Sequence, residues 1–89
     1  MLKKKDLDKI IILSIKEVLE NPDNVDLESF FTGPKSVIES IDIVQIISFV
    51  EEKLEEKGFE GFDLLEKVFE YETLKFSDFS NLIEKELNT

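Results

Sequence analysis

The sequence of 89 residues contains no cysteine and no histidine. Without cysteine, the chain has no disulfide, no thiolate nucleophile and no cysteine-based metal site. Without histidine, it lacks the most common general base and the most common protein metal ligand. These absences argue against an ordinary enzyme. We therefore expect no catalytic residue and no metal site.

Long apolar runs are also missing. The longest, at residues 10–15, is far shorter than the roughly 20 residues that cross a bilayer. The first residues lack the apolar stretch of a secretory signal peptide. We expect a cytoplasmic protein that does not insert into membranes.

The charge is strongly acidic and unevenly spread. Eleven lysines against 21 acidic residues give a net charge of 11 − 21 = −10. Residues 21–60 carry ten of the acids and three of the lysines, a net charge of −7. Such a chain repels phosphate backbones and anionic membrane surfaces, so we expect no nucleic-acid binding and partners that are basic.

The pattern of apolar residues predicts an all-α fold in a single domain, residues 1–89. Hydrophobic residues make up 42% of the chain, which is too many for a disordered acidic tail. The three-to-four spacing of apolar positions predicts three longer helices and one short one, at residues 6–20, 40–57, 62–69 and 77–87. We expect Asp6 and Ser77 to cap the first and fourth helices, and Pro22 and Gly58 to end the first and second.

A loop of nearly twenty residues, 21–39, separates the first two predicted helices. Gly33-Pro34 is its turn signal. Its apolar residues, which we expect to pin it to the helices, are Val25, Leu27, Phe30, Phe31, Val37 and Ile38. We expect the eight phenylalanines to be core residues in general. A long loop held down in this way is frequently functional.

The second predicted helix has a core stripe and a second, smaller set of apolar residues. Placing residues 100° apart groups one core face, formed by Ile43, Ile46, Ile47, Val50 and Leu54. Ile41 and Val44 fall outside this face. The acids around them are Glu39, Asp42, Glu51 and Glu52. The two apolar residues either pack under a neighbouring loop beside solvated acids or form a docking surface ringed by negative charge.

Ser40 stands at the start of this helix. A serine there is most often an N-cap. The same position suits a serine that carries a phosphate ester, because first-turn N–H groups and the helix dipole stabilise an anion. Ser36 is the competing serine, but it lies in the loop and lacks a following apolar-acidic pair.

The residues around Ser40 resemble the signature of the acyl carrier protein family. The motif is Glu39-Ser40-Ile41-Asp42, followed by an apolar helix and the Glu-rich segment Val50-Glu51-Glu52-Lys53-Leu54. Residues 73–76 and 79–83 are similar to the family's last helix and the segment before it. The likeness covers nearly the whole chain, and it implies a four-helix acyl-carrier-like bundle with a long loop between the first two helices.

The resemblance implies a carrier without catalytic activity of its own. A phosphopantetheinyl transferase would attach 4′-phosphopantetheine from coenzyme A to Ser40, and the arm would hold an acyl or aminoacyl group as a thioester. A loading ligase and downstream acyl-transfer enzymes with basic docking patches would be the partners of a monomeric carrier. By position, Ile41 and Val44 match the family's apolar partner contacts. The matching acidic recognition positions are Glu39, Asp42, Glu51 and Glu52.

The motif departs from the family pattern at several positions. Glu39 replaces the usual Asp, Ile41 the usual Leu, and Gln45 stands where an acid is common. The glycine that usually precedes the serine is absent. These changes favour a specialised carrier in fatty acid, polyketide or related acyl-transfer biosynthesis over the housekeeping protein of fatty acid synthesis.

A second hypothesis is an unmodified acidic helical adaptor that binds a basic partner through the second helix. Two other interpretations are less favoured. The acids at residues 23–28 lack the spacing and glycine of an EF-hand, so solvation explains them better than calcium. The pairs Glu51-Glu52 and Glu55-Glu56 are typical of a solvated helix face rather than of a glycosidase site.

Overall fold

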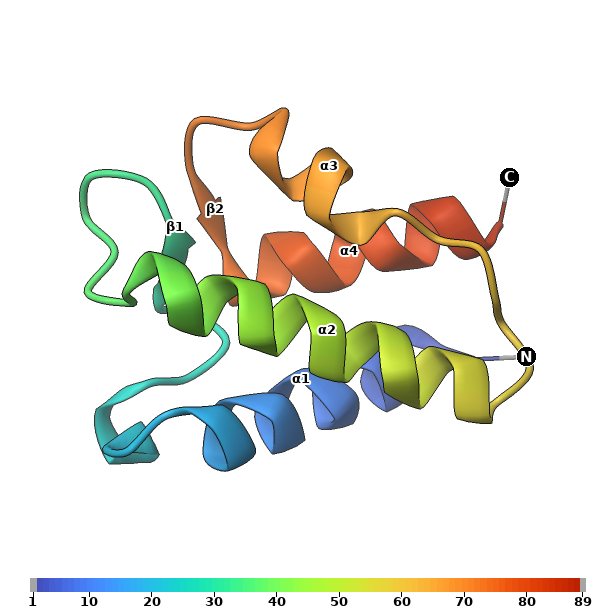
Figure 1. Cartoon of the computed structure of the whole chain (residues 1–89), viewed down its shortest axis with the longest axis horizontal. Helices are drawn as coiled ribbons and strands as arrows, with labels where there is room; N and C mark the ends of the chain where they lie inside the picture. Colours follow the sequence, from blue (N-terminus) through green and yellow to red (C-terminus); the bar gives the residue numbers. More distant parts are fainter. Residues whose placement is uncertain (1, 89) are drawn as a thin grey trace.

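The computed structural model describes residues 2–88 (Figure 1). This part of the chain is mostly helical, with three long helices and a short one. The helices are α1 (Lys4–Val18), α2 (Ser40–Glu56), α3 (Leu64–Phe69) and α4 (Phe76–Leu87). A short 3₁₀ helix, η1 (Pro22–Asn24), follows α1, and two short strands, β1 (Phe30–Thr32) and β2 (Leu74–Lys75), complete the fold. None of the helices in residues 2–88 is long and apolar enough to cross a membrane.

Helix α1 packs against both α2 and α4 and runs opposite to them (Figure 1). The predicted core stripe of α2 is confirmed, because all five of its residues are buried. The residues that α1 and α4 bury beside it are Leu7, Ile10, Ile11, Ser14, Ile15, Phe76, Phe79, Ser80 and Ile83. One face of each long helix therefore forms a common apolar core.

The two strands correct the all-α prediction. Strand β1 pairs with β2 in an antiparallel ladder that places Phe30 opposite Lys75 and Thr32 opposite Leu74. Strands of three and two residues are too short to show a period of two in the sequence, so alternation did not reveal them. The small sheet joins the long loop to the chain segment that leads into α4.

Phe31 on β1 anchors the long loop in the core. Its ring is fully buried, with its centroid 4.7 Å from that of Phe76 and 5.0 Å from that of Phe79. The prediction that apolar residues pin the loop is confirmed for this ring and for the partly buried residues that pack on the core, Val25, Leu27 and Ile38. Of the other two predicted anchors, Phe30 is half-buried and Val37 is 86% exposed. Val37 therefore does not pin the loop to the core.

The expectation that phenylalanines are core residues was too broad. Phe31, Phe76 and Phe79 are fully buried, whereas Phe69 on the short helix α3 is 58% exposed. A six-residue helix makes fewer than two turns and can bury only a narrow stripe. That stripe is formed by Leu64 and Val68, which leaves Phe69 outside.

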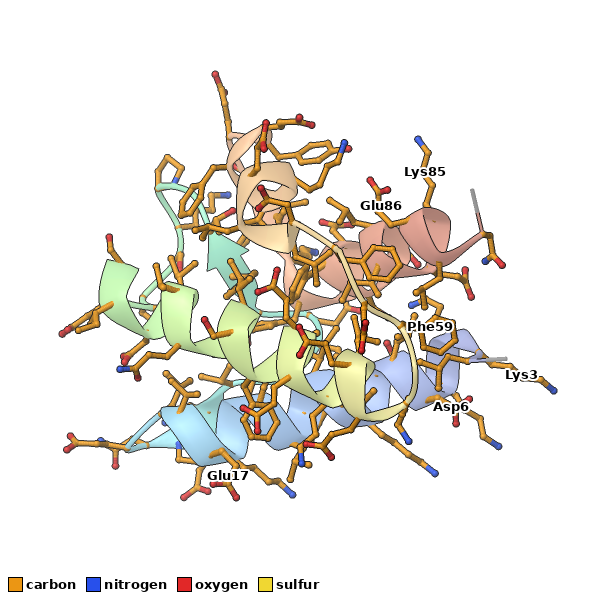
Figure 2. All side chains as sticks on the ribbon, turned by 45° about the vertical axis from the view of Figure 1, so that its right-hand side comes forward. Lys3, Asp6, Glu17, Phe59, Lys85 and Glu86 are labelled. Atoms are coloured by element: carbon orange, nitrogen blue, oxygen red, sulfur yellow. The ribbon has the colours of Figure 1, made fainter. Side chains whose placement is uncertain are left out.

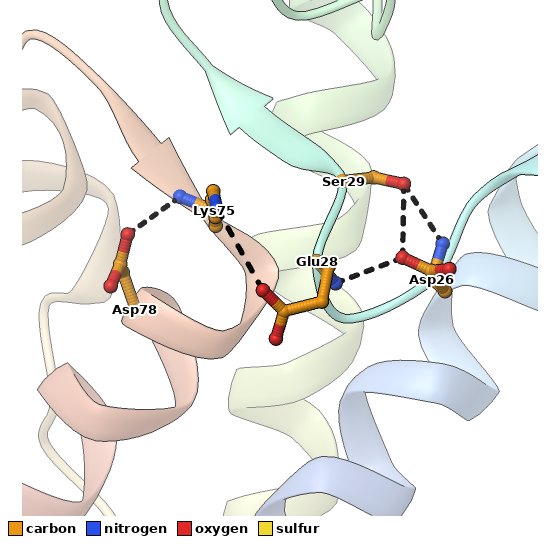
Figure 3. A network of polar contacts seen from close by, with 5 residues as sticks. All are labelled: Asp26, Glu28, Ser29, Lys75 and Asp78. Carbon is orange, nitrogen blue, oxygen red and sulfur yellow. Dashed lines mark hydrogen bonds and ion pairs between the residues drawn. The ribbon is translucent and has the colours of Figure 1, made fainter.

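The starts of α1 and α4 correct two predicted caps. Lys3 is the residue before α1, and its backbone N–H donates to Oδ2 of Asp6 at 2.9 Å, so Asp6 acts from the third helical position (Figure 2). In α4, the N–H of Lys75 donates to Oδ2 of Asp78 at 3.0 Å, and Ser77 is not the cap (Figure 3). In both helices a carboxylate satisfies an N–H group that the helix itself leaves free.

The remaining helix ends lie near the predicted positions. Helix α1 stops at Val18, two residues earlier than expected, because Leu19 takes an extended conformation. Gly58 ends α2 as predicted: its φ is 92°, and its N–H and that of Phe59 donate to the carbonyls of the last turn. Helix α3 begins at Leu64 rather than at residue 62, with Asp63 as its cap.

Gly33 offers a test of how the long loop packs against the residues just before β2. Its φ is 103°, and a Cβ there would lie 2.6 Å from Oγ1 of Thr73. Gly61 has a similar φ of 84°, but a Cβ there would meet no atom within 4 Å. We expect Gly61→Ala to lower the free energy of unfolding by about 1–2 kcal/mol through backbone strain. Gly33→Ala should cost roughly 1–3 kcal/mol more through the clash. Equal losses in urea unfolding would contradict this account.

Asp6 should make stability depend on acidic pH. The hydrogen bond from the Lys3 N–H lowers the pKa of Asp6 below its ordinary value of 3.8, and nearby lysines act in the same direction. Its stabilising contribution is therefore present above pH 3.8 and is lost as the pH falls through the lower folded pKa. Asp6→Asn should lose less stability on acidification than the wild type does, as measured by urea unfolding across the acid range. Asp23→Asn, at an exposed position, serves as the control and should follow the wild type.

Candidate functional site

The first residue of α2 is Ser40, and Glu39 before it is the residue at the N-cap position. Ser40 is therefore not the N-cap, contrary to the commonest role of a serine at a helix start. Its side chain is exposed, and no hydrogen bond joins its hydroxyl to another residue in 2–88. The hydroxyl is free for contact from outside the molecule.

The start of α2 differs from the starts of the other helices. Helices α1 and α4 have the carboxylate caps described above, and in α3 Oδ1 of Asp63 accepts from the Glu66 N–H at 3.2 Å. Asp42 holds the third position of α2, as Asp6 does in α1, yet it makes no such bond. Among the described residues, the N–H groups of Ser40, Ile41 and Asp42 have no acceptor. This helix start retains its capacity to bind an anion.

Ser36, the competing serine, has a structural role. Its hydroxyl donates to the carbonyl of Phe31 at 2.9 Å and accepts from the N–H of Ile38 at 3.1 Å. It is half-buried in the turn that follows Gly33. Those two bonds hold the loop between β1 and α2, so the two serines differ clearly in availability.

The predicted apolar pair lies beside Ser40 and faces solvent. Ile41 is 64% exposed and Val44 is 41% exposed, which confirms that they lie outside the core. Glu39 is exposed and Asp42 is half-buried at the same end of α2. The structure thus brings a free hydroxyl, two exposed apolar side chains and two acids together within the first two turns of the helix.

Glu51 and Glu52 lie farther away. They follow Ser40 by 11 and 12 positions, which corresponds to roughly 17 Å along the helix axis. Glu52 is exposed, whereas Glu51 is half-buried, and its Oε2 accepts from the N–H of Leu64 at 3.0 Å. Glu51 therefore binds the first turn of α3, a structural role that the sequence pattern did not show.

The acids of the long loop hold a turn. Oδ1 of Asp26 accepts from the N–H of Glu28 at 2.9 Å and from the hydroxyl of Ser29 at 3.3 Å (Figure 3). The Glu28 carboxylate lies 3.7 Å from Nζ of Lys75. No group of three or more acidic, histidine or cysteine side chains in residues 2–88 is arranged to hold a metal ion. These contacts fix the loop against the start of α4.

A cavity of about 550 Å³ lies beside the start of α2. It is bounded by the end of α1, the segment after η1 and the last loop residues before α2. Glu39 and Asp42, which flank Ser40, line it, and Glu20, two residues after the end of α1, adds a third carboxylate. In the sequence, the position before the helix-ending Asn21-Pro22 pair is the one signal that Glu20 carries, and it does not mark a binding site.

Comparison of the chain with protein-family models, with curated proteins and with solved structures found no match.

Glu51 provides a test that separates a structural role from a recognition role. Glu51→Ala should lower the free energy of unfolding by about 1 kcal/mol, because the Leu64 N–H loses its charged acceptor. The Leu64 amide should also exchange faster with solvent. Glu52→Ala is the matched control, since Glu52 is exposed and no hydrogen bond joins its side chain to the described residues. If the two variants exchange at Leu64 at the same rate, the assigned role of Glu51 is wrong.

Proposed function

We propose that this protein is a carrier that holds acyl or aminoacyl groups on a 4′-phosphopantetheine arm attached to Ser40. The observation that carries the proposal is the free Ser40 hydroxyl at a helix start that lacks a side-chain cap. The order of elements supports it: an amphipathic first helix, a long loop, the serine motif, a short third helix and a closing helix. In this proposal the protein is a four-helix acyl-carrier-like bundle with a small added sheet.

The residues at the start of α2 suit a phosphate ester. The exposed hydroxyl of Ser40 can enter the active site of another enzyme without breaking an internal hydrogen bond. In the transfer, Ser40 Oγ would form a bond to the phosphorus that carries the pantetheine of coenzyme A. The bond from that phosphorus to the bridging oxygen of the diphosphate would break and release adenosine 3′,5′-diphosphate, and the transferase would take the serine proton. The attached phosphate would then lie near the unpaired N–H groups of α2, at the positive end of the helix dipole.

The arm supplies the thiol that this chain lacks, and the thiol carries the cargo as a thioester. The chain itself would position the serine and present a docking surface, so we propose no catalytic activity for it. Ile41 and Val44 would contact partners, and Glu39, Asp42 and Glu52 would attract basic patches on them. The proposed partners are a phosphopantetheinyl transferase, a loading ligase and acyl-transfer enzymes of a cytoplasmic pathway.

The modification of Ser40 is tested by mass. Incubation with coenzyme A and a broad-specificity phosphopantetheinyl transferase should add the mass of one phosphopantetheine to the wild-type chain. Ser40→Ala should gain nothing, because its attachment oxygen is missing. Ser48→Ala, at another exposed serine of α2, should gain as much as the wild type. No gain on the wild type, or a full gain on Ser40→Ala, would refute the carrier proposal.

A second candidate function, an unmodified adaptor, is favoured by the exposure of Ile41 and Val44 alone. The two functions predict different effects of two substitutions on the protein's function in cells. An adaptor should keep its cellular function with Ser40→Ala, which removes only a hydroxyl. It should lose partner binding with Ile41→Asp, which puts a charge in the apolar contact. A carrier should lose its cellular function with Ser40→Ala, because the arm can no longer be attached.

A further inference from the structure

The cavity beside Ser40 is lined by apolar side chains and by carboxylates. Its volume of about 550 Å³ falls within the range of roughly 300–1,000 Å³ that is typical of small-molecule sites. Val18 and Leu19 from the end of α1, with Val25 and Ile38 from the loop, supply apolar surface. All four are partly buried against the core and therefore form a wall fixed by packing.

The rim of this cavity carries one sign of charge. The carboxylates of Glu20, Glu39 and Asp42 line it, and none of its lining residues is a lysine. None of the three carboxylates has a hydrogen-bond or ion-pair partner among the described residues. The end of α1 at Val18 adds the negative end of a helix dipole. A phosphate on Ser40 would occupy the positive end of the α2 dipole.

Among the described residues, the hollow between α2 and the segment leading to α3 is far smaller. The hollow there, beside Leu54, Phe59 and Phe62, measures about 10 Å³, which is no more than a single water requires. A long hydrocarbon chain would have to open this part of the core. The cavity beside Ser40 is already formed, but its carboxylates give a neutral chain no favourable electrostatic contact.

We propose that this cavity receives a cargo with a protonated amine, which makes the cargo an aminoacyl group rather than a fatty acyl chain. The inference rests on the proposed function, since the arm on Ser40 would bring the cargo to the cavity. The ammonium would pair with the carboxylates of Glu20, Glu39 and Asp42, and a small aliphatic side chain would contact Val18 and Val25. A cargo with a free carboxylate would be repelled by the same rim.

The absence of cysteine allows this idea to be tested without any transferase. Ser40→Cys places the only thiol of the chain at the attachment position. Two iodoacetamide linkers of equal length would be attached to it, one ending in an alanyl amide and the other in an isobutyryl amide. The two ends have nearly the same shape and differ by an ammonium group in place of a methyl group.

The alanyl linker should shift the NMR signals of Val18, Leu19 and Val25, and the isobutyryl linker should leave them largely unchanged. The alanyl amine should bind its proton about two- to fivefold more tightly than in the free linker, seen as a higher amine pKa. Glu20→Gln combined with Glu39→Gln and Asp42→Asn should abolish both effects. Raising the salt to 1 M should also return the amine pKa toward its free value, because the screening length falls to roughly 3 Å. The salt measurement keeps the test valid if the triple variant does not fold.

Equal shifts from both linkers, or no shift from either, would overturn the cargo inference. An amine pKa equal to that of the free linker would also overturn it. A failure of the transferase reaction on the wild-type chain would instead refute the carrier proposal. Because attachment through the cysteine does not depend on that reaction, the two failures are distinguishable.

Discussion

The burial of Phe31 between Phe76 and Phe79 is the contact on which the rest of the structure depends. It holds the middle of a loop of nearly twenty residues against α4, at ring distances of 4.7 and 5.0 Å. The N–H groups at the start of α4 then donate to loop carbonyls, from Phe76 to Ser29 at 3.1 Å and from Ser77 to Leu27 at 2.8 Å. A loop fixed at its centre leaves few arrangements for its end, so the start of α2 is held in place while it stays exposed. The burial of this ring helps to offset the ordering entropy of the loop.

The helix starts of this acidic chain differ in whether a carboxylate accepts a backbone N–H. In α1, α3 and α4 an aspartate accepts a backbone N–H and replaces the bond that the helix cannot make. In α2 the aspartate at the third position makes no such bond, and the N–H groups of the first turn have no acceptor among the described residues. Exposed N–H groups in water cost little, because solvent pairs with them. The uncapped start of α2 thus loses little stability, and it keeps a place for an anion beside the free hydroxyl of Ser40.

The sequence predicted the features that depend on helical period. The core stripe of α2 and the position of Ile41 and Val44 outside it follow from spacing along one helix, and the stop at Gly58 follows from the residue type. The features it did not predict depend on contacts between distant segments. Strands β1 and β2 are too short to carry a pattern, and Glu51 binds a helix that begins 13 residues later. The cavity likewise joins Glu20 to Asp42, which are 22 positions apart in the sequence. No local sequence signal marks any of these contacts.

The strength of the proposed cargo contact matters as much as its chemistry. A carrier must deliver its cargo to successive enzymes, so a cavity that held the cargo tightly would oppose its function. Exposed ion pairs contribute only about 0.2–1 kcal/mol each, and the glutamates at the rim of this cavity are solvent-exposed. Three such carboxylates would favour the bound position of an ammonium without making release slow. Exposed acids beside apolar side chains would therefore suit transient shelter of an aminoacyl group, whereas a sealed tunnel in the core would require part of the fold to open at every transfer.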